Sequence, residues 1–272
     1  MNLASTTLDL SSLATSKIAT WDIETELIPD TGLKDIKKIF CMNVKVNDQP
    51  IKRFTKLYHP TSSGNLKGAL KLINSCDFNV GHNILGFDIP VIENLVGEVT
   101  SYPLDTLLLC KLMYTSDQLY NIDRGIEDMP KDIQGGYSLK AYGYRFGDHK
   151  IQFEQFEKLT DEMLEYCDQD VNLTYRIFSF LIKQTNFPAA NVIHLENRVA
   201  NIIRNQTDNG FYFDIDKAKS LYTNMRFEKL SKDRNLQKIF SPMYLPEGPI
   251  KTTAKLIKRR QYLPSTTQLK GW

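Results

Sequence analysis

Apolar stretches separated by short polar turns fill the first third of the chain and predict strands. Three runs have the composition of strands: Ile18–Glu24, Ile39–Val46 and Ile51–Leu57. The segment Asn47-Asp48-Gln49-Pro50 has turn chemistry, so the second and third runs are expected to form a hairpin. A helix over about residues 66–74 and a short strand over Phe78–Gly81 are expected next.

Helical periodicity dominates the remainder of the chain. Helices are expected over about residues 90–95, 105–114, 138–144, 161–181, 191–209 and 215–239. Residues 115–137, in which Asp, Gly and Pro are scattered, predict a long loop. Gly210 is expected to end its helix in the left-handed conformation. Early strands followed by helices that cover them predict an α/β domain.

The same pattern divides the chain into three parts. Residues 1–16 are expected to be a loosely ordered lead-in, and residues 17–186 form the α/β domain. Residues 187–272 start at a linker, Phe187–Ala190, and are helical at first, then basic and irregular. This last region is too short and too open to bury a full core of its own.

Composition narrows the class of protein. The 272 residues are 42% hydrophobic, which is typical of a soluble globular protein. The longest apolar run, Ile177–Ile182, contains a serine and is far shorter than the ~18 residues of a membrane span, so a membrane protein is excluded. Cys41, Cys76, Cys110 and Cys167 lack the spacing of a zinc or redox site, and the N-terminus lacks the pattern of a secretory signal. Together these features predict a reducing, intracellular setting.

Charge is distributed unevenly along the chain. Residues 226–272 hold 11 Lys/Arg and 3 Asp/Glu, a net charge of +8, while residues 1–225 hold 23 basic and 29 acidic residues, a net charge of −6. An acidic body with a basic end suits a carboxylate site beside a segment that contacts a polyanion such as DNA. The alternative is an ordinary solvated basic surface.

The first strand carries two carboxylates. Asp22 and Glu24 are two residues apart, so they share one face of the strand, opposite Trp21 and Ile23. Like charges placed together are costly unless a cation neutralises them. The alternative is a solvent-facing strand edge, because the Asp-x-Glu pattern alone is weak.

A third acid, Asp88, lies where a strand ends and a helix begins. Phe87 can anchor the turn that precedes it. The alternative for Asp88 is an N-capping role, which is common at such positions. His82, in the same turn, is given no chemical role.

The fourth acid is Asp170, on the long predicted helix. Tyr166 lies four residues before it and therefore on the same face, which continues through apolar positions and points inward. An aspartate on that face needs a partner, and a metal ion can provide it. Asp168 points elsewhere and is expected to be solvated.

Taken together, Asp22, Glu24, Asp88 and Asp170 can bind two divalent cations through oxygen ligands, as Mg²⁺ or Mn²⁺ prefer. Such an ion pair can activate a water and stabilise the leaving 3′ oxygen in phosphodiester cleavage. Tyr166 would orient the attacking water through its hydroxyl.

These segments resemble the three exonuclease motifs of the DEDD 3′–5′ exonucleases, which have a ribonuclease H-like fold. Tyrosine at position 166, four residues before Asp170, matches the tyrosine subfamily. The resemblance implies that Thr25, Asn83 and Phe87 line the path of the terminal nucleotides. It also implies that Asp105 is a structural aspartate at a helix start.

Further segments resemble family A DNA polymerases of the phage replicative branch. They begin at Leu104, Tyr137, Leu195 and Asn209. The resemblance covers roughly residues 17–240 and implies a proofreading exonuclease followed by the start of the polymerase thumb. It also implies a role in DNA replication in the cytoplasm of a phage-infected bacterium.

The chain departs from that family in one respect. None of its four histidines is followed by aspartate, so the His-Asp pair of the polymerase active site is missing. We therefore expect an N-terminal piece of such a polymerase, from a truncated or split gene, with a separate polymerase fragment as a possible partner. Two alternatives to the exonuclease are a non-catalytic module that braces a polymerase subunit and a stand-alone ribonuclease of the same fold.

Overall fold

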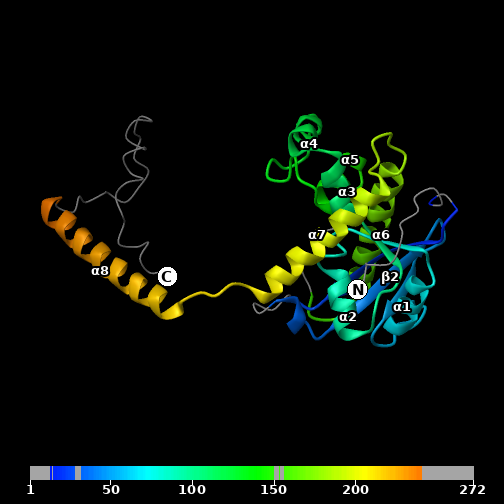
Figure 1. Ribbon diagram of the computed structural model, residues 1–272, viewed down its shortest axis with the longest axis horizontal. Helices are drawn as coiled ribbons and strands as arrows, with labels where there is room; N and C mark the ends of the chain where they lie inside the picture. Colours follow the sequence, from blue (N-terminus) through cyan, green and yellow to red (C-terminus); the bar gives the residue numbers. More distant parts are fainter. Residues whose placement is uncertain (1–12, 14, 28–31, 150–152, 154–155, 241–272) are drawn as a thin grey trace, which may run out of the picture. The chain divides into compact units, whose positions relative to one another are not determined.

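A mixed five-stranded sheet forms the centre of the protein. The computed structural model describes residue 13 and residues 15–27, 32–149, 153 and 156–240 (Figure 1). The strands are β1 (Ile18–Thr25), β2 (Ile39–Val46), β3 (Lys52–Thr55), β4 (Phe78–Gly81) and β5 (Tyr102–Asp105). Their order is β3-β2-β1-β4-β5; β2 is antiparallel to β1 and β3, while β4 is parallel to β1 and β5. This is the strand order of the ribonuclease H-like fold, so the predicted fold class is confirmed.

Helices surround the sheet and continue beyond it. They are α1 (Leu66–Asn74), α2 (Asp88–Leu95), α3 (Thr106–Met113), α4 (Ser116–Asp123), α5 (Leu139–Phe146), α6 (Asp161–Leu181), α7 (Ala190–Asn209) and α8 (Ile215–Ile239), with a short 3-10 helix, η2 (Leu33–Asp35). Side-chain caps explain where several begin: Asn65, Ser138 and Thr160 each accept a hydrogen bond from a backbone N–H of the first turn.

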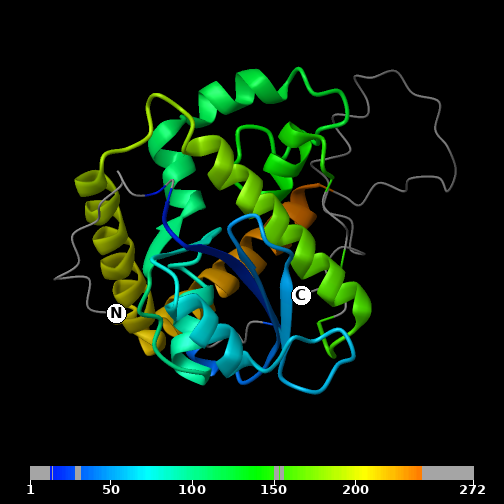
Figure 2. The same ribbon diagram turned by 90° about the vertical axis from the view of Figure 1, so that its right-hand side faces the viewer.

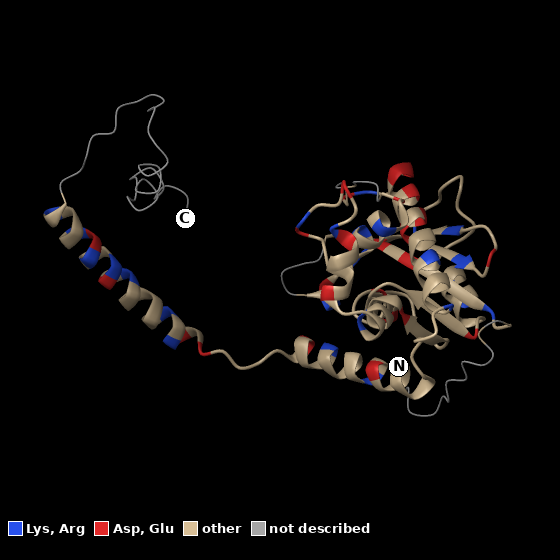
Figure 3. Ribbon diagram, turned by 90° about the horizontal axis from the view of Figure 1, so that it is seen from above, with Lys and Arg blue, Asp and Glu red and all other residues tan. Residues whose placement is uncertain are grey.

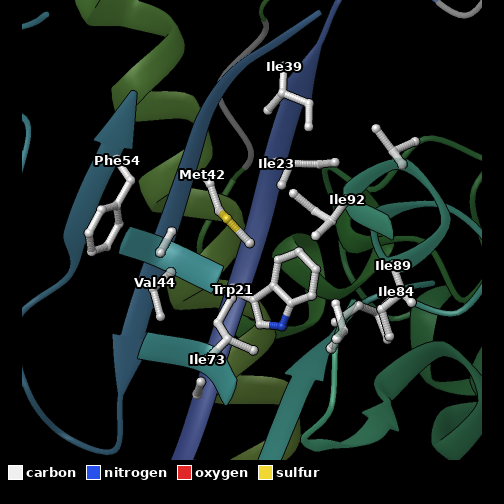
Figure 4. Close-up of a cluster of buried hydrophobic side chains, with 14 of the residues drawn as sticks. Trp21, Ile23, Ile39, Met42, Val44, Phe54, Ile73, Ile84, Ile89 and Ile92 are labelled. Carbon is white, nitrogen blue, oxygen red and sulfur yellow. The ribbon is translucent and has the colours of Figure 1, made fainter. Parts of the chain in front are cut away.

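The two faces of the sheet have different coverings. On one face, β1 and β2 contribute apolar side chains that pack against α1, α2 and the turn before α2 (Figure 4). On the other face, α6 lies across β1, β2 and β4 (Figure 2). Because side chains alternate along a strand, β1 sends Trp21 and Ile23 to the apolar face and Asp22 and Glu24 toward α6.

Two elements correct the sequence prediction. Residues 115–137 are not one long loop, because α4 lies within them. Its start is marked by a capping box, in which Thr115 and Gln118 bond each other's backbone N–H groups. The strand β5 was also not predicted. Proline within its sequence, Tyr102-Pro103-Leu104-Asp105, argues against a strand, and the structure places it at the sheet edge, where a missing N–H is tolerated.

The compact unit that contains the sheet runs to Gly210 and includes α7. Ile193 of α7 belongs to a buried cluster, and Asn197 Nδ2 donates to the Pro103 carbonyl at 2.9 Å. The predicted domain boundary at residue 186 stays a prediction. The helix α7 ends at Asn209 with Gly210 as its C-cap, as predicted, and the positive φ of 64° suits glycine. The ψ of −162° lies outside the left-handed helical region itself.

The second compact unit starts at Phe211, and α8 is its described helix. Figure 3 shows Lys and Arg positions, in blue, distributed along the ribbon of α8. Most of the predicted basic end, residues 241–272, lies outside the described residues, as does most of the predicted lead-in. Within the part of the chain that is described, no helix has both the length and the apolarity to cross a bilayer.

Candidate active site

The strand β1 brings Asp22 and Glu24 to the face of the sheet that α6 covers. Glu24 is buried and Asp22 is half-buried. Asp22 pairs with Asn43 of β2, and Glu24 pairs with Cys41, so both acids belong to regular rungs of the central ladder. The predicted shared face is therefore what the structure has, and the solvent-facing alternative does not apply to Glu24.

Asp88 reaches the same strand from the start of α2. Its Oδ1 accepts a hydrogen bond from the Ile23 N–H at 3.3 Å. The strand β4 pairs with β1 only at Ile18–Thr20. Beyond Thr20, the Asp88 carboxylate accepts the Ile23 N–H, which β4 does not reach. Asp88 is the first residue of α2 rather than its N-cap, so the capping alternative is not the arrangement found.

The turn that delivers Asp88 is itself held by Asp105. The carboxylate of Asp105 accepts hydrogen bonds from the N–H groups of Asn83 (2.9 Å), Leu85 (3.2 Å) and Leu107 (2.9 Å). Asp105 is thus the N-cap of α3 and the anchor of this turn, in agreement with the structural role that the resemblance implied. Gly81 opens the turn, where a Cβ would lie 2.5 Å from Ile84 Cδ1.

The helix α6 supplies Tyr166 and Asp170. Asp170 is buried, and Tyr166 is half-buried against the rings of Phe153 and Phe156, with ring centroids 5.5 and 6.4 Å away. Between them along the helix, the Cys167 thiol is buried and donates to the Asp22 carbonyl at 3.6 Å. This contact places the Tyr166–Asp170 segment over the carboxylates of β1.

Crowded negative charge dominates the electrostatics of this region. Burial, followed by repulsion from Asp22, raises the pKa of Asp88 well above its usual range. Burial also raises the pKa of the Cys167 thiol well above its usual range, with smaller contributions from Cys41 and the two β1 carboxylates. Ionising all of these groups together is unfavourable unless a cation neutralises them.

The donor set fits a hard divalent cation. Single oxygens of Asp22 and Glu24 and the Cys167 sulfur lie within 4.8 Å of one another. The carboxylate oxygens are the ligands that Mg²⁺ and Mn²⁺ prefer, whereas thiolate sulfur suits softer ions. Asp88 interacts electrostatically with Asp22, so its carboxylate would also be drawn to an ion there.

One prediction about α6 is wrong. Asp168 was expected to be solvated, but its side chain is only 23% exposed. Its Oδ2 accepts from Arg53 Nε at 2.9 Å and Nη2 at 2.6 Å, and its Oδ1 accepts from Asn43 Nδ2 at 2.7 Å. We name this group of Arg53, Asn43 and Asp168 the α6 clamp. The sequence gives no local sign of it, because Asp168 lies more than 100 residues from both Arg53 and Asn43.

Three further predicted site residues are close in sequence to the acids: Thr25 follows Glu24, and Asn83 and Phe87 precede Asp88. Thr25 is buried, with its hydroxyl donating to the Glu26 carbonyl at 2.8 Å. Asn83 has a left-handed φ of 63° in the turn before α2, and Phe87 is the N-cap residue of α2. Their predicted contacts with terminal nucleotides stay predictions, as do the catalytic and metal-binding roles of the acids and Tyr166.

Comparisons with known proteins add relatives but no family assignment. No family model matches the chain. It is 26% identical over 215 residues to the DNA-directed DNA polymerase of Enterobacteria phage T3, covering 62% of this chain and 30% of that protein. It is 25% identical over 238 residues to the DNA-directed DNA polymerase of Escherichia phage T7, covering 70% and 34%. The chain therefore spans about a third of the length of these curated relatives.

Solved structures give weaker likenesses. Brucella melitensis NrnC bound to pGG has a TM-score of 0.47 and 16% identity, covering 73% of this chain and 88% of that chain. Trypanosoma brucei RNase D has a TM-score of 0.43 and 15% identity, covering 71% and 67%. Both TM-scores lie below 0.5, and these likenesses carry no conclusion about function.

Proposed function

We propose that this chain is a metal-dependent 3′–5′ exonuclease that removes nucleotides from single-stranded or mispaired DNA ends. One observation carries the proposal: the start of α2, with Asp88, and the Cys167 turn of α6 both contact the strand that carries Asp22 and Glu24. Tyr166 and Asp170 lie on α6 beside Cys167. Asp88 bonds the backbone of β1, and Cys167 contacts Asp22 from α6. Mutually repelling carboxylates placed together in a partly buried site are typical of a cation-dependent active site.

Each residue has a distinct part in the proposed mechanism. Asp22, Glu24, Asp88 and Asp170 would hold Mg²⁺ or Mn²⁺. Two such ions would supply an activated water and charge stabilisation at the leaving 3′ oxygen. Tyr166 would orient the water through its hydroxyl, which can both donate and accept a hydrogen bond. Thr25, Asn83 and Phe87 would contact the terminal nucleotides.

The relatives favour DNA over RNA as the substrate. Both are DNA-directed DNA polymerases, and the matches cover 62% and 70% of this chain. We therefore propose proofreading for a family A polymerase as the biological role, with primer extension carried by residues outside this chain. A separate polymerase fragment is the partner that we propose for this role. Mixing the two and measuring primer extension tests that part of the proposal.

The central test is the digestion of 5′-labelled single-stranded oligonucleotides of DNA and of RNA, with Mg²⁺ or with a chelator. The expected result is a ladder of DNA products that shorten from the 3′ end and disappear when the metal is chelated. An oligonucleotide with a blocked 3′ end is the control and should survive. Cleavage of RNA alone would favour the ribonuclease alternative, and absence of any cleavage would favour the non-catalytic module.

A further inference from the structure

The long helix α6 has to present two residues of the proposed site in a fixed orientation. Tyr166 and Asp170 lie about one turn apart; Asp170 is buried, and Tyr166 is half-buried against Phe153 and Phe156. Asp168 lies between them in sequence, rotated by about 200° from each, because successive helix residues are about 100° apart. Whatever holds Asp168 therefore also fixes the rotation of α6 about its axis.

The α6 clamp holds Asp168 from two strands at once. Arg53 of β3 donates twice to Oδ2, at 2.9 and 2.6 Å, and Asn43 of β2 donates to Oδ1 at 2.7 Å. The Asn43 amide also donates to the Leu164 carbonyl at 3.1 Å, which ties the preceding turn of α6 to the same residue. A two-point Arg–carboxylate contact fixes direction as well as distance. Its effect on Arg53 is visible, because the hydrogen bond to Asp168 raises the pKa of that guanidinium.

The clamp is continuous with the proposed metal site. Asp22 pairs with Asn43, and Asn43 pairs with Arg53, so the three residues form one rung across β1, β2 and β3. The helix α6 crosses this rung. Its Cys167 thiol donates to the Asp22 carbonyl, and its Asp168 carboxylate accepts from Asn43 and Arg53. Because the same rung holds Asp22 and bonds α6, a shift of α6 would change its distance from Asp22.

We infer that Arg53, Asn43 and Asp168 are positioning residues, which set the rotation of α6 so that Tyr166 and Asp170 face the carboxylates of β1. This inference rests on the proposed exonuclease function. Removal of groups that orient metal ligands typically costs about 10- to 100-fold in metal affinity or activity. Loss of the clamp should therefore lower metal affinity and kcat and leave KM for the oligonucleotide within about twofold, because none of the three is placed on the substrate.

The chain offers a matched control on the same helix. Arg176 of α6 donates through Nη1 to Asp148 at 2.7 Å, in another Arg–Asp pair. That pair joins α6 to the end of α5 rather than to β2 and β3. The variant Arg176→Met removes a comparable ion pair from α6 without touching the rung.

The experiment compares Arg53→Met, Asp168→Asn and Arg176→Met in the full chain. Mn²⁺ affinity is measured without substrate from the electron paramagnetic resonance signal of free Mn²⁺, and kcat and KM are measured on a single-stranded oligonucleotide. Hydrogen exchange of residues 164–170 reports directly whether this part of α6 is held. Arg53→Met and Asp168→Asn should weaken Mn²⁺ binding and kcat by about 10- to 100-fold and speed exchange there. Arg176→Met should stay within about twofold of wild type.

A charge-reversed double variant distinguishes a positioning role of the Arg53–Asp168 pair from a general effect on stability. The double variant Arg53→Asp with Asp168→Arg restores an ion pair of reversed polarity and should recover at least about tenfold of the kcat lost by either single change. Equal losses in Arg176→Met, or unchanged Mn²⁺ binding and kcat in folded clamp variants, would overturn the inference alone. Wild-type chain that neither binds Mn²⁺ nor cleaves would overturn the proposed function, and the inference with it.

Discussion

The two faces of the central sheet differ in what their side chains are suited to do. One face is a continuous apolar cluster around Trp21, Met42 and Ile73, packed against α1 and α2. The other carries acids of β1 together with Asn43 and Arg53, and α6 lies over it. The same strand β1 serves both faces, so a single eight-residue segment contributes to the core and to the proposed site. Substitutions on the apolar face should therefore lower stability and spare activity. Substitutions of the acids on the α6 face should lower activity and spare stability.

The largest effect is expected on the polar face. Asp170→Ala should reduce cleavage by roughly a thousandfold or more, since losing several kcal/mol of metal-supplied stabilisation corresponds to that factor. The melting temperature without metal should not fall, because removing one of several crowded carboxylates relieves repulsion. Steady-state cleavage and thermal unfolding measure the two quantities. Activity within tenfold of wild type would remove Asp170 from the metal site.

The converse change lies on the apolar face. Ile73 of α1 is fully buried, and Ile73→Ala should lower the free energy of unfolding by about 2–5 kcal/mol. Cleavage measured well below the melting temperature should remain close to wild type, because α1 packs on the side of the sheet away from α6. Chemical denaturation with circular dichroism gives the stability. A large loss of activity in folded Ile73→Ala protein would break the separation between the faces.

A smaller effect is expected for the tyrosine. Tyr166→Phe keeps the ring contacts with Phe153 and Phe156 and removes only the hydroxyl. If the hydroxyl positions water, cleavage should fall by about 10²–10⁴-fold, and by less than in Asp170→Ala. Metal affinity should be unchanged. Weakened Mn²⁺ binding in this variant would mean that Tyr166 does more than orient water.

The smallest effect concerns Asp88 and pH. Its pKa in the fold is raised by burial and by Asp22, so its ionisation destabilises the metal-free protein above that raised pKa. Asp88→Asn keeps the oxygen that accepts from Ile23 and should melt a few degrees higher than wild type at pH 7.5 without metal. The difference should shrink as the pH falls through the raised pKa toward ~4, where the wild-type carboxyl is also neutral. Differential scanning calorimetry across that range, with and without Mg²⁺, measures this difference. The metal should stabilise the wild type more than Asp88→Asn, which keeps three of the four proposed carboxylate ligands.

The sequence was sufficient for features that depend on short-range pattern. Period-two alternation placed Asp22 and Glu24 on one face, and the spacing of four placed Tyr166 with Asp170 on the inward side of α6. Sequence pattern does not predict contacts between segments that are far apart along the chain. Asp168 looked solvated because its partners, Arg53 and Asn43, are more than 100 residues away along the chain. The strand β5 was missed because a proline masks a short edge strand whose pairing comes entirely from β4.

The burial of the four cysteines has a practical consequence for labelling experiments. Cys41, Cys76, Cys110 and Cys167 are all free and buried, and burial raises the pKa of Cys110 to about 12. Thiol-reactive dyes attack the thiolate, so the native thiols should react slowly while the protein stays folded. One cysteine introduced on the exposed surface of α8 would then accept a fluorophore selectively. The natural sequence is thus already suited to fluorescence measurements of nucleic-acid binding, without removal of any native cysteine.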